Sequence, residues 1–450
     1  MHKKYIARAI STSAYTPERK PHTFTRLHSV SLAEKTKCKD GESLVLYKDK
    51  HTMAETSTSS ASQETQLNPS TIYTFHTETL YAGRQTSIKM TVRDRKIEYV
   101  PGDSILLWVS NSESIANTLM ELLDVPADRW ISFQRIHNRT SSVVFSFAGM
   151  ASDYFRHFLD TTSLPSKLFL YRLSEYACEE EKDKLAYLSS KEGSAEYFMM
   201  IRNWNSIIDI LIQFRVKVPL EVLLEVCTEI KPRAFSLINK KENDIELIVG
   251  VISNSTEEST RNGHFSEYAV STANSREKTE TAEDTDKNMR IFDSSIAYRI
   301  QLKANRLLRL REETTNALLF GIGTGVAPFI SFIRNHGSSC KFSLFYGCRN
   351  RDENILVKIG LVSGPGEESK YAGAVLFRVG PTDVHVVYSR ESMCLRMHDF
   401  LAKNKEKIDD ECKQFFNDLY ICGNKGAMAA VSAYFEDAHP NMKKYIDDWS

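Results

Sequence analysis

The feature that most constrains the fold is a glycine-rich turn between an apolar run and a helical pattern. Gly321, Gly323 and Gly325 lie between the apolar stretch ALLF and the sequence VAPFISFIRN. Glycine permits a tight turn and lets a phosphate approach the backbone, and the start of a helix offers unpaired N–H groups to an anion. The spacing fits neither the GxGxxG dinucleotide motif nor a Walker A loop. The turn therefore indicates an anion site only through its context.

Strand and helix patterns alternate after this turn. Apolar strands are predicted at 341–349, 385–390 and 418–423, and helices over 392–408 and 427–438. This alternation is typical of a doubly wound parallel sheet, in which the carboxyl ends of the strands lie on one rim. The residues that follow or end the strands should therefore converge on one crevice. They are Arg349, Asp352, Ser389, Arg390 and Cys422.

The sequence before the turn changes character twice. Runs of β-branched and aromatic residues predict antiparallel strands from Ile72, a helical pattern extends from Ser152 to Glu229, and strands return at RAFSLIN and IELIVGVIS. A polar stretch at 254–290 predicts a long loop around one short helix. The predicted parts are a basic, disordered Ser/Thr-rich tail (1–70), a first β part (71–150), a helical insertion (151–230), a second β part (231–312) and an α/β domain (313–450).

Composition excludes several classes of protein. The 450 residues include 58 Lys and Arg and 58 Asp and Glu, so no global basic field exists to hold nucleic acid. The eight cysteines form no CxxC pair, which indicates free thiols in a reducing compartment and no metal site. The longest apolar stretch, 316–333, contains three Gly and a Pro and is a poor membrane span. We expect a cytoplasmic protein, with a mitochondrial or other organelle-targeting leader as the alternative.

A series of motifs carries a resemblance to a known family. In order they are EYVPGD, LPSKLFLYRLSEYA, KPRAFS, NGHFSEY, GIGTGVAPF, FYGCRNRDENIL, YSRE, YICGNKGAM and YIDDWS. From about Ile72 to Ser450 the chain resembles the FAD- and NADPH-binding half of the diflavin reductases, which include the NADPH–cytochrome reductases. The resemblance implies a fold like that of ferredoxin-NADP reductase. That fold is an antiparallel FAD-binding β-barrel with a helical connecting domain inserted, followed by a parallel NADP-binding sheet.

The resemblance implies which residues bind FAD. Arg233, Phe235 and Ser236 match an Arg-x-Tyr-Ser motif that binds the FAD phosphate and packs on the flavin ring, with Phe235 in place of the tyrosine. A second segment, which lies along the FAD pyrophosphate, is matched by Gly263, Phe265 and Ser266.

Roles in nucleotide binding and hydride transfer are implied in the same way. The pyrophosphate of NADPH would lie on Gly323, Thr324 and Gly325, and the nucleotide crevice would contain Arg349, Asp352, Ser389 and Arg390. Ser236, Cys422 and Asp447 match family residues that assist hydride transfer, and Trp449 matches the aromatic residue that covers the flavin.

Two departures from the family leave alternatives open. Leu395 and Met397 occupy positions where the family has a Lys and a Tyr for the 2′-phosphate, and Arg396 could substitute, so the choice between NADPH and NADH stays open. A flavodoxin domain is not expected in residues 1–70. We therefore expect an NADPH-dependent FAD reductase that passes electrons to a separate flavodoxin-like, iron–sulfur or haem protein. The alternatives are a fragment of a full-length diflavin reductase and a catalytically degenerate scaffold or regulatory homologue.

Overall fold

The structure, a computed structural model, describes residues 28–32, 75–81, 86–92, 98–137, 140–240, 244–255, 260–270, 299–391 and 395–448. The chain divides into two compact units. The main part of unit 1 is Trp108–Lys231. Unit 2 contains the described parts of Glu64–Leu107, Pro232–Ser253 and Asn262–Ser450. Each unit is described by itself below.

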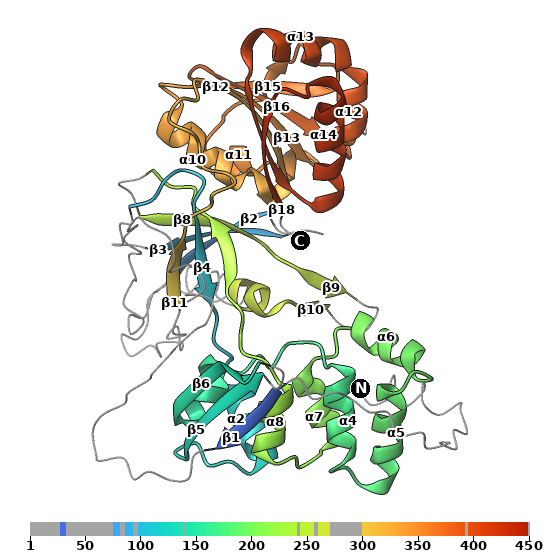
Figure 1. Cartoon of the computed structure of the whole chain (residues 1–450). Coiled ribbons are helices and arrows are strands. Elements are labelled where there is room, and N and C mark those ends of the chain that lie inside the picture. The colour runs from blue at the N-terminus through green and yellow to red at the C-terminus, as the bar shows by residue number, and fades with distance from the viewer. Residues whose placement is uncertain are drawn as a thin grey trace, which may run out of the picture. The chain divides into compact units, whose positions relative to one another are not determined.

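Unit 2 contains two three-stranded sheets, in the orders β2-β3-β8 and β11-β4-β7 (Figure 1). Antiparallel ladders join β2 to β3, β3 to β8 and β4 to β7. In β3, Ile88, Met90 and Val92 alternate with less buried residues, which gives this strand one core face. The six strands are β2 (Phe75–Tyr81), β3 (Ser87–Val92), β4 (Ser104–Trp108), β7 (Arg233–Ser236), β8 (Ile245–Gly250) and β11 (Arg299–Lys303).

The two sheets do not close into the predicted β-barrel within the described residues. One isolated bridge, between Leu237 and Leu247, connects them. Next to this bridge the Ile238 N–H donates to the Glu246 carbonyl of β8 at 2.9 Å, and the Ile238 carbonyl accepts a hydrogen bond from the Arg334 guanidinium. The predicted antiparallel strands are thus confirmed, whereas closure of the barrel is not observed.

A seven-stranded sheet forms the C-terminal part of unit 2, in the order β14-β15-β16-β13-β12-β17-β18. Five neighbouring strands are parallel: β16 (Thr382–Tyr388), β13 (Lys341–Cys348), β12 (Asn316–Ile322), β17 (Asp418–Gly423) and β18 (Lys443–Asp448). The predicted parallel sheet is therefore confirmed. Two strands that the sequence did not predict, β14 (Glu367–Glu368) and β15 (Ala374–Val379), add an antiparallel edge.

Helices cover both faces of this sheet, as in a doubly wound fold (Figure 1). Phe329 and Phe332 of α10 are buried in one apolar cluster, and Phe400 of α12 and Phe435 of α14 are buried in another. The elements that connect the strands are the 3₁₀ helices η2 (Gly323–Val326) and η3 (Arg351–Glu353) and the helices α10 (Ala327–His336), α11 (Ile355–Lys358), α12 (Met397–Lys403), α13 (Lys405–Phe415) and α14 (Lys425–Ala438).

Unit 1 combines helices with a three-stranded sheet in the order β1-β5-β6. Its strands are β1 (His28–Leu32), β5 (Trp130–His137) and β6 (Ser142–Met150). Its helices are α2 (Glu113–Leu123), α3 (Ala151–His157), α4 (Lys167–Ser174), α5 (Glu179–Ser189), α6 (Ser194–Arg202), α7 (Ile207–Phe214) and α8 (Leu220–Val226). No helix among the residues that the structure describes is long and apolar enough to cross a lipid bilayer.

The boundary of unit 1 differs from the predicted division at residue 150. Strands β5 and β6 belong to unit 1, because Phe133 and Phe147 pack in the same buried cluster as Phe169 of α4 and Leu223 of α8. Alternating apolar residues predict a strand, but they do not indicate which core that strand joins.

Two sequence predictions concern segments that the structure describes only in part. Residues 28–32, inside the predicted disordered tail, form β1, which pairs with the edge of β5. The remainder of 1–70 lies outside the described residues. The polar stretch at 254–290 contains β9 (Ser253–Ser255), β10 (Thr260–Asn262) and the predicted short helix at 264–270.

Candidate functional site

The glycine-rich turn forms the strand–loop–helix junction that the sequence predicted. It leaves β12, continues as η2 and enters α10, which has Pro328 in its first turn. A Cβ atom on Gly325 would lie 2.5 Å from both the Cys422 carbonyl oxygen and the Gly423 Cα, so only glycine fits there. Gly323 has a φ of +58° and open space around it. The loop thus packs closely against the end of β17 and leaves the backbone at Gly323 accessible.

Thr324 links this loop to strand β8. A Cβ atom on Gly250, the last residue of β8, would lie 3.2 Å from the Thr324 Cγ2 and 3.4 Å from its Oγ1. The absence of a side chain at Gly250 therefore allows the loop to approach the strand closely. Of the three residues predicted to hold a pyrophosphate, Thr324 lies beside β8 and Gly325 lies beside β17.

The carboxyl ends of the parallel strands meet as predicted. Gly321 of β12 lies opposite Cys422 of β17, and Cys422 lies opposite Asp447 of β18. Cys422 is fully buried and Asp447 is partly exposed. Asn424 then caps α14 by accepting a hydrogen bond from the Ala427 N–H at 3.0 Å, so the chain turns into a helix directly after the thiol.

An arginine follows each of the neighbouring strands β13 and β16: Arg349 comes directly after β13, and Arg390 comes two residues after the end of β16. The Arg390 N–H donates to the Arg349 carbonyl at 2.7 Å, which brings the segments after β13 and β16 together. Arg349 is half-buried and lies 3.8 Å from Glu353, while Arg390 is exposed. Burial raises the pKa of the Glu353 carboxyl above its ordinary value, although Arg349 opposes this effect. Two planar cations at adjacent strand ends are suited to bind an anionic group.

The other crevice residues lie at the same strand ends. Ser389 is partly exposed, and its N–H donates to the Cys348 carbonyl at 2.9 Å. Asp352 is exposed within η3. The role of both residues in binding a nucleotide stays a prediction.

The positions that depart from the family are apolar and packed. Met397 is only 7% exposed and belongs to the apolar cluster around Phe400, and its Cε would lie 3.1 Å from a Cβ atom on Gly347. Leu395 packs against the same cluster. Arg396 is exposed at the start of α12. Of these three residues, Arg396 alone could present a positive charge to a nucleotide.

The side chains of the first predicted FAD segment lie on two opposite faces of strand β7. Successive side chains of a strand point to opposite sides, so Arg233 and Phe235 share one face and Ser236 lies on the other. Arg233 is exposed, whereas Ser236 is 1% exposed and pairs in register with Ser104 of β4. The Ser236 hydroxyl has no hydrogen-bond partner among the residues that the structure describes. An unpaired buried hydroxyl costs about 1–3 kcal/mol, so Ser236 fits a bound group that accepts its hydrogen bond.

The second predicted FAD segment lies against the first. The ring centroids of Phe235 and Phe265 are 4.6 Å apart. Ile252 holds the segment in place, because its N–H donates to Ser266 Oγ at 2.9 Å and its carbonyl accepts from the Gly263 N–H at 2.8 Å. The two segments, which are separate in sequence, thus form one aromatic-lined region.

Sequence reasoning missed a part-buried network of hydrogen bonds beside Asp447. Asn305 Nδ2 donates to Asp447 Oδ2 at 2.7 Å, and the Asn305 N–H donates to Asp103 Oδ1 at 3.0 Å. Asp103 is fully buried and binds the Arg309 guanidinium through both oxygens, at 2.7 and 2.9 Å. Asp103 directly precedes Ser104, the register partner of Ser236. The two hydrogen bonds of Asn305 therefore connect Asp447 to Asp103, which is next to the register partner of Ser236. Trp449 lies outside the described residues, so its role stays a prediction.

Comparison with known proteins defines the class of this site. Residues 81–268 match the family model of the FAD binding domain, a range that includes both predicted FAD segments. Similar curated proteins are the NADPH–cytochrome P450 reductases of Bos taurus and Homo sapiens, each 25% identical over 360 residues, which are 76% of this chain and 49% of the relative. The Dictyostelium discoideum enzyme of the same name is 25% identical over 378 residues, 79% of this chain and 52% of the relative.

The chain is therefore similar to the FAD- and NADPH-binding half of the diflavin reductases. It spans about half the length of the curated relatives that it matches. The resemblance drawn from the sequence motifs is thus confirmed.

Proposed function

We propose that this chain is an NADPH-dependent FAD reductase, which takes hydride from NADPH and passes electrons to a separate redox protein. The main support is the connection between Ser236 and Asp447. Cys422 lies beside Asp447 in register, and Asn305 links Asp447 to Asp103, which adjoins the register partner of Ser236. A hydroxyl, a thiol and a carboxylate are therefore held in one unit, as hydride chemistry at a flavin requires.

Each of these residues has a defined task in the proposed reaction. Bound FAD supplies a ring that accepts hydride and later releases single electrons. The buried Ser236 hydroxyl would donate a hydrogen bond to FAD from one face of β7, and Phe235, supported by Phe265, would pack against FAD from the other. Cys422 is fully buried and lies opposite Asp447 in register, so it would line the inner side of the site. Asp447, held by Asn305, would stabilise positive charge on a bound nicotinamide.

The nucleotide would bind along the carboxyl ends of the parallel strands. The backbone at Gly323 would contact the pyrophosphate, and Arg349 and Arg390 would bind the phosphate on the ribose. Because Leu395 and Met397 add no charge, we expect NADPH to be preferred over NADH by a smaller factor than in an enzyme with a Lys and a Tyr there.

The electron acceptor is proposed only as a class. The named relatives reduce cytochrome P450, a haem protein, and a flavodoxin-like or iron–sulfur protein is equally compatible with a FAD reductase. No disulfide joins the six cysteines that the structure describes, which supports a reducing compartment such as the cytoplasm. A mitochondrial or other organellar location is the alternative.

Anaerobic stopped-flow reduction tests this proposal. The purified protein should be yellow, and NADPH and NADH, mixed in parallel with it, should bleach the flavin absorbance at different rates. A colourless protein that cannot be reconstituted with FAD would contradict the proposal.

A second candidate is a catalytically degenerate homologue that retains the fold. It is favoured by the burial of Met397 in an apolar cluster, where the family has a nucleotide-binding residue. Ferricyanide reduction distinguishes the two, because turnover with this artificial acceptor requires bound FAD and access of the nicotinamide. A yellow protein without ferricyanide reductase activity would favour the degenerate homologue.

A further inference from the structure

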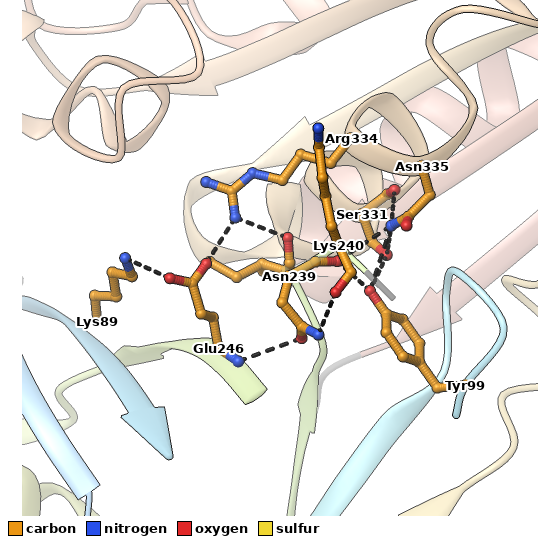
Figure 2. Close-up of polar contacts among 9 residues, drawn as sticks. Lys89, Tyr99, Asn239, Lys240, Glu246, Ser331, Arg334 and Asn335 are labelled. Carbon is orange, nitrogen blue, oxygen red and sulfur yellow. Dashed lines mark hydrogen bonds and ion pairs between the residues drawn. The ribbon is translucent and has the colours of Figure 1, made fainter. Parts of the chain in front are cut away.

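Helix α10 is hydrogen-bonded along one side to strand β8 and to the segment that follows β7, the strand with the first predicted FAD residues (Figure 2). Arg334 Nη1 donates to Glu246 Oε2 at 2.8 Å and to the Ile238 carbonyl at 2.9 Å. Glu246 also pairs with Lys89 Nζ at 2.7 Å on the side away from α10. Arg334 and Glu246 are each about four-fifths buried, so solvent screens their attraction only partly.

A second group of contacts involves Asn239 and Asn335, which directly follow Ile238 and Arg334 in the sequence. The Tyr99 hydroxyl donates to the Asn239 carbonyl and lies 3.1 Å from Ser331 Oγ on α10. Asn335 Nδ2, also on α10, donates to the same carbonyl at 3.1 Å. Tyr99, Asn239 and Ser331 are almost fully buried. Burial raises the pKa of Tyr99, so its hydroxyl stays protonated and continues to donate.

These contacts connect two parts of the proposed site. Helix α10 follows directly from the loop that contains Thr324, while Ile238 and Asn239 come two and three residues after Ser236. Strand β8 contacts the loop at one end, where Gly250 lies against Thr324, and contacts α10 at the other end through Glu246. Helix α10 donates hydrogen bonds to the successive carbonyls of Ile238 and Asn239. These bonds restrict both the distance of α10 from β7 and its rotation relative to that strand.

We propose that Arg334 and Tyr99 are positioning residues, which hold the nucleotide loop at a set distance from Ser236 so that the nicotinamide meets the flavin in one geometry. The inference rests on the proposed function. Hydride transfer requires the reacting atoms to be about 3–3.5 Å apart, and a displacement of about 1 Å can slow such a reaction a hundredfold. Directional bonds are suited to this task because apolar surfaces can slide past one another.

The test compares Arg334→Met and Tyr99→Phe with the control Lys89→Met. The control removes an ion pair to the same Glu246 without changing any contact of α10. We expect Arg334→Met to lower the limiting rate of FAD reduction by NADPH about tenfold, with FAD content retained and KM changed less than kcat. Backbone amides at 323–326 should exchange faster with solvent. Lys89→Met should match the wild-type protein in both measurements.

Further variants separate positioning from folding. Arg334→Lys keeps a cation opposite Glu246 and should recover part of the rate. If Arg334→Met does not fold, Tyr99→Phe and Glu246→Gln, compared with Lys89→Met, provide the same two measurements.

Two results are decisive. Folded Arg334→Met protein with wild-type reduction rate and wild-type amide exchange would overturn the inference. If wild-type protein with bound FAD is not reduced by NADPH, the proposed function fails, and amide exchange at 323–326 still decides whether Arg334 holds the loop.

Discussion

Asn305 donates a hydrogen bond to Asp447 across 142 residues of sequence, and the distance between Nδ2 and Oδ2 is 2.7 Å. The Asn305 Oδ1 accepts from the Leu307 and Leu308 N–H groups at 3.1 and 3.2 Å, so this side chain also caps its own turn. The two ends of one amide thus have separate tasks. One end holds the local backbone, and the other holds the carboxylate.

This division allows the substitution Asn305→Asp to separate the two tasks. An aspartate keeps an oxygen that accepts from Leu307 and Leu308, but it replaces the donor to Asp447 with a repelling carboxylate. We expect the rate of hydride transfer from NADPH to fall about tenfold, with FAD content and the unfolding midpoint little changed. The exposed Leu307, changed to Ala, is the control and should leave the rate unaltered. Normal hydride transfer in Asn305→Asp would show that Asp447 needs no such partner.

The ion pair between Asp103 and Arg309 should contribute strongly to stability. Asp103 is fully buried, so Arg309→Met would leave its charge without a counter-ion. Removing one partner of a buried pair costs about 3–5 kcal/mol in the free energy of unfolding, and we expect the lower end because the Arg309 side chain is 40% exposed. Chemical denaturation measures this change.

The control for this measurement is Arg378→Met. Arg378 pairs with Glu367 at 2.7 Å, and their side chains are 58% and 66% exposed. Such a surface pair contributes about 0–1 kcal/mol. If Arg309→Met and Arg378→Met lower the free energy of unfolding equally, the pair between Asp103 and Arg309 contributes no more to stability than a surface ion pair.

The sequence predicted those parts of the fold that rest on local pattern. The apolar strands β12, β13, β16 and β17 and the glycine-rich turn between β12 and α10 are each visible in a few consecutive residues. Strand β18 was not predicted, because its sequence KKYIDD has few apolar residues and its strand form depends on pairing with β17. Cys422 and Asp447 become neighbours through that pairing.

The polar partners of the site could not be predicted from local pattern. Asp103 was visible only as the last residue of the motif EYVPGD, because its partner Arg309 lies 206 residues further along the chain. Arg334 has the appearance of an ordinary charge near a helix end, yet it binds a carbonyl 96 residues earlier. Contacts of this kind depend on how the sheets and α10 pack, and neither periodicity nor motif spacing contains that information.

Gly325→Ala should damage the nucleotide site while FAD binding is retained. The added Cβ would lie 2.5 Å from the Cys422 carbonyl oxygen, which is backbone and cannot move aside easily. Overpacking of this kind typically costs about 1–3 kcal/mol. Because the strain falls on the loop, we expect NADP⁺ to bind at least about tenfold more weakly, as measured by calorimetry.

Gly426→Ala is the matched control for this substitution. Gly426 is in the first turn of α14, where the nearest atom to an added Cβ is Asn424 Oδ1 at 3.9 Å. Alanine favours a helix over glycine by about 1 kcal/mol, so this variant should be no less stable than the wild-type protein. Unchanged NADP⁺ affinity in Gly325→Ala would argue that the loop does not contact the pyrophosphate.

His385 should make the stability of unit 2 sensitive to acid. It is 1% exposed in β16, and its Nδ1 lies 2.9 Å from Ser369 Oγ. Burial, together with the positive charges of Lys370 and Arg378, lowers the pKa of His385 from 6.5 to about 3. Between these values the unfolded chain binds a proton that the folded chain does not, so the free energy of unfolding decreases as the pH falls through this window.

The contribution of His385 can be measured by comparing pH profiles of unfolding. Its largest slope is about 1.4 kcal/mol per pH unit, between pH 6.5 and 3. His385→Gln has no imidazole to protonate, so its free energy of unfolding should fall less steeply from pH 7 to pH 4 than that of the wild-type protein. His398→Gln, at an exposed histidine, should give a profile parallel to the wild type. If His385→Gln also gives a parallel profile, then the buried imidazole accepts a proton within the folded chain and burial does not keep it neutral.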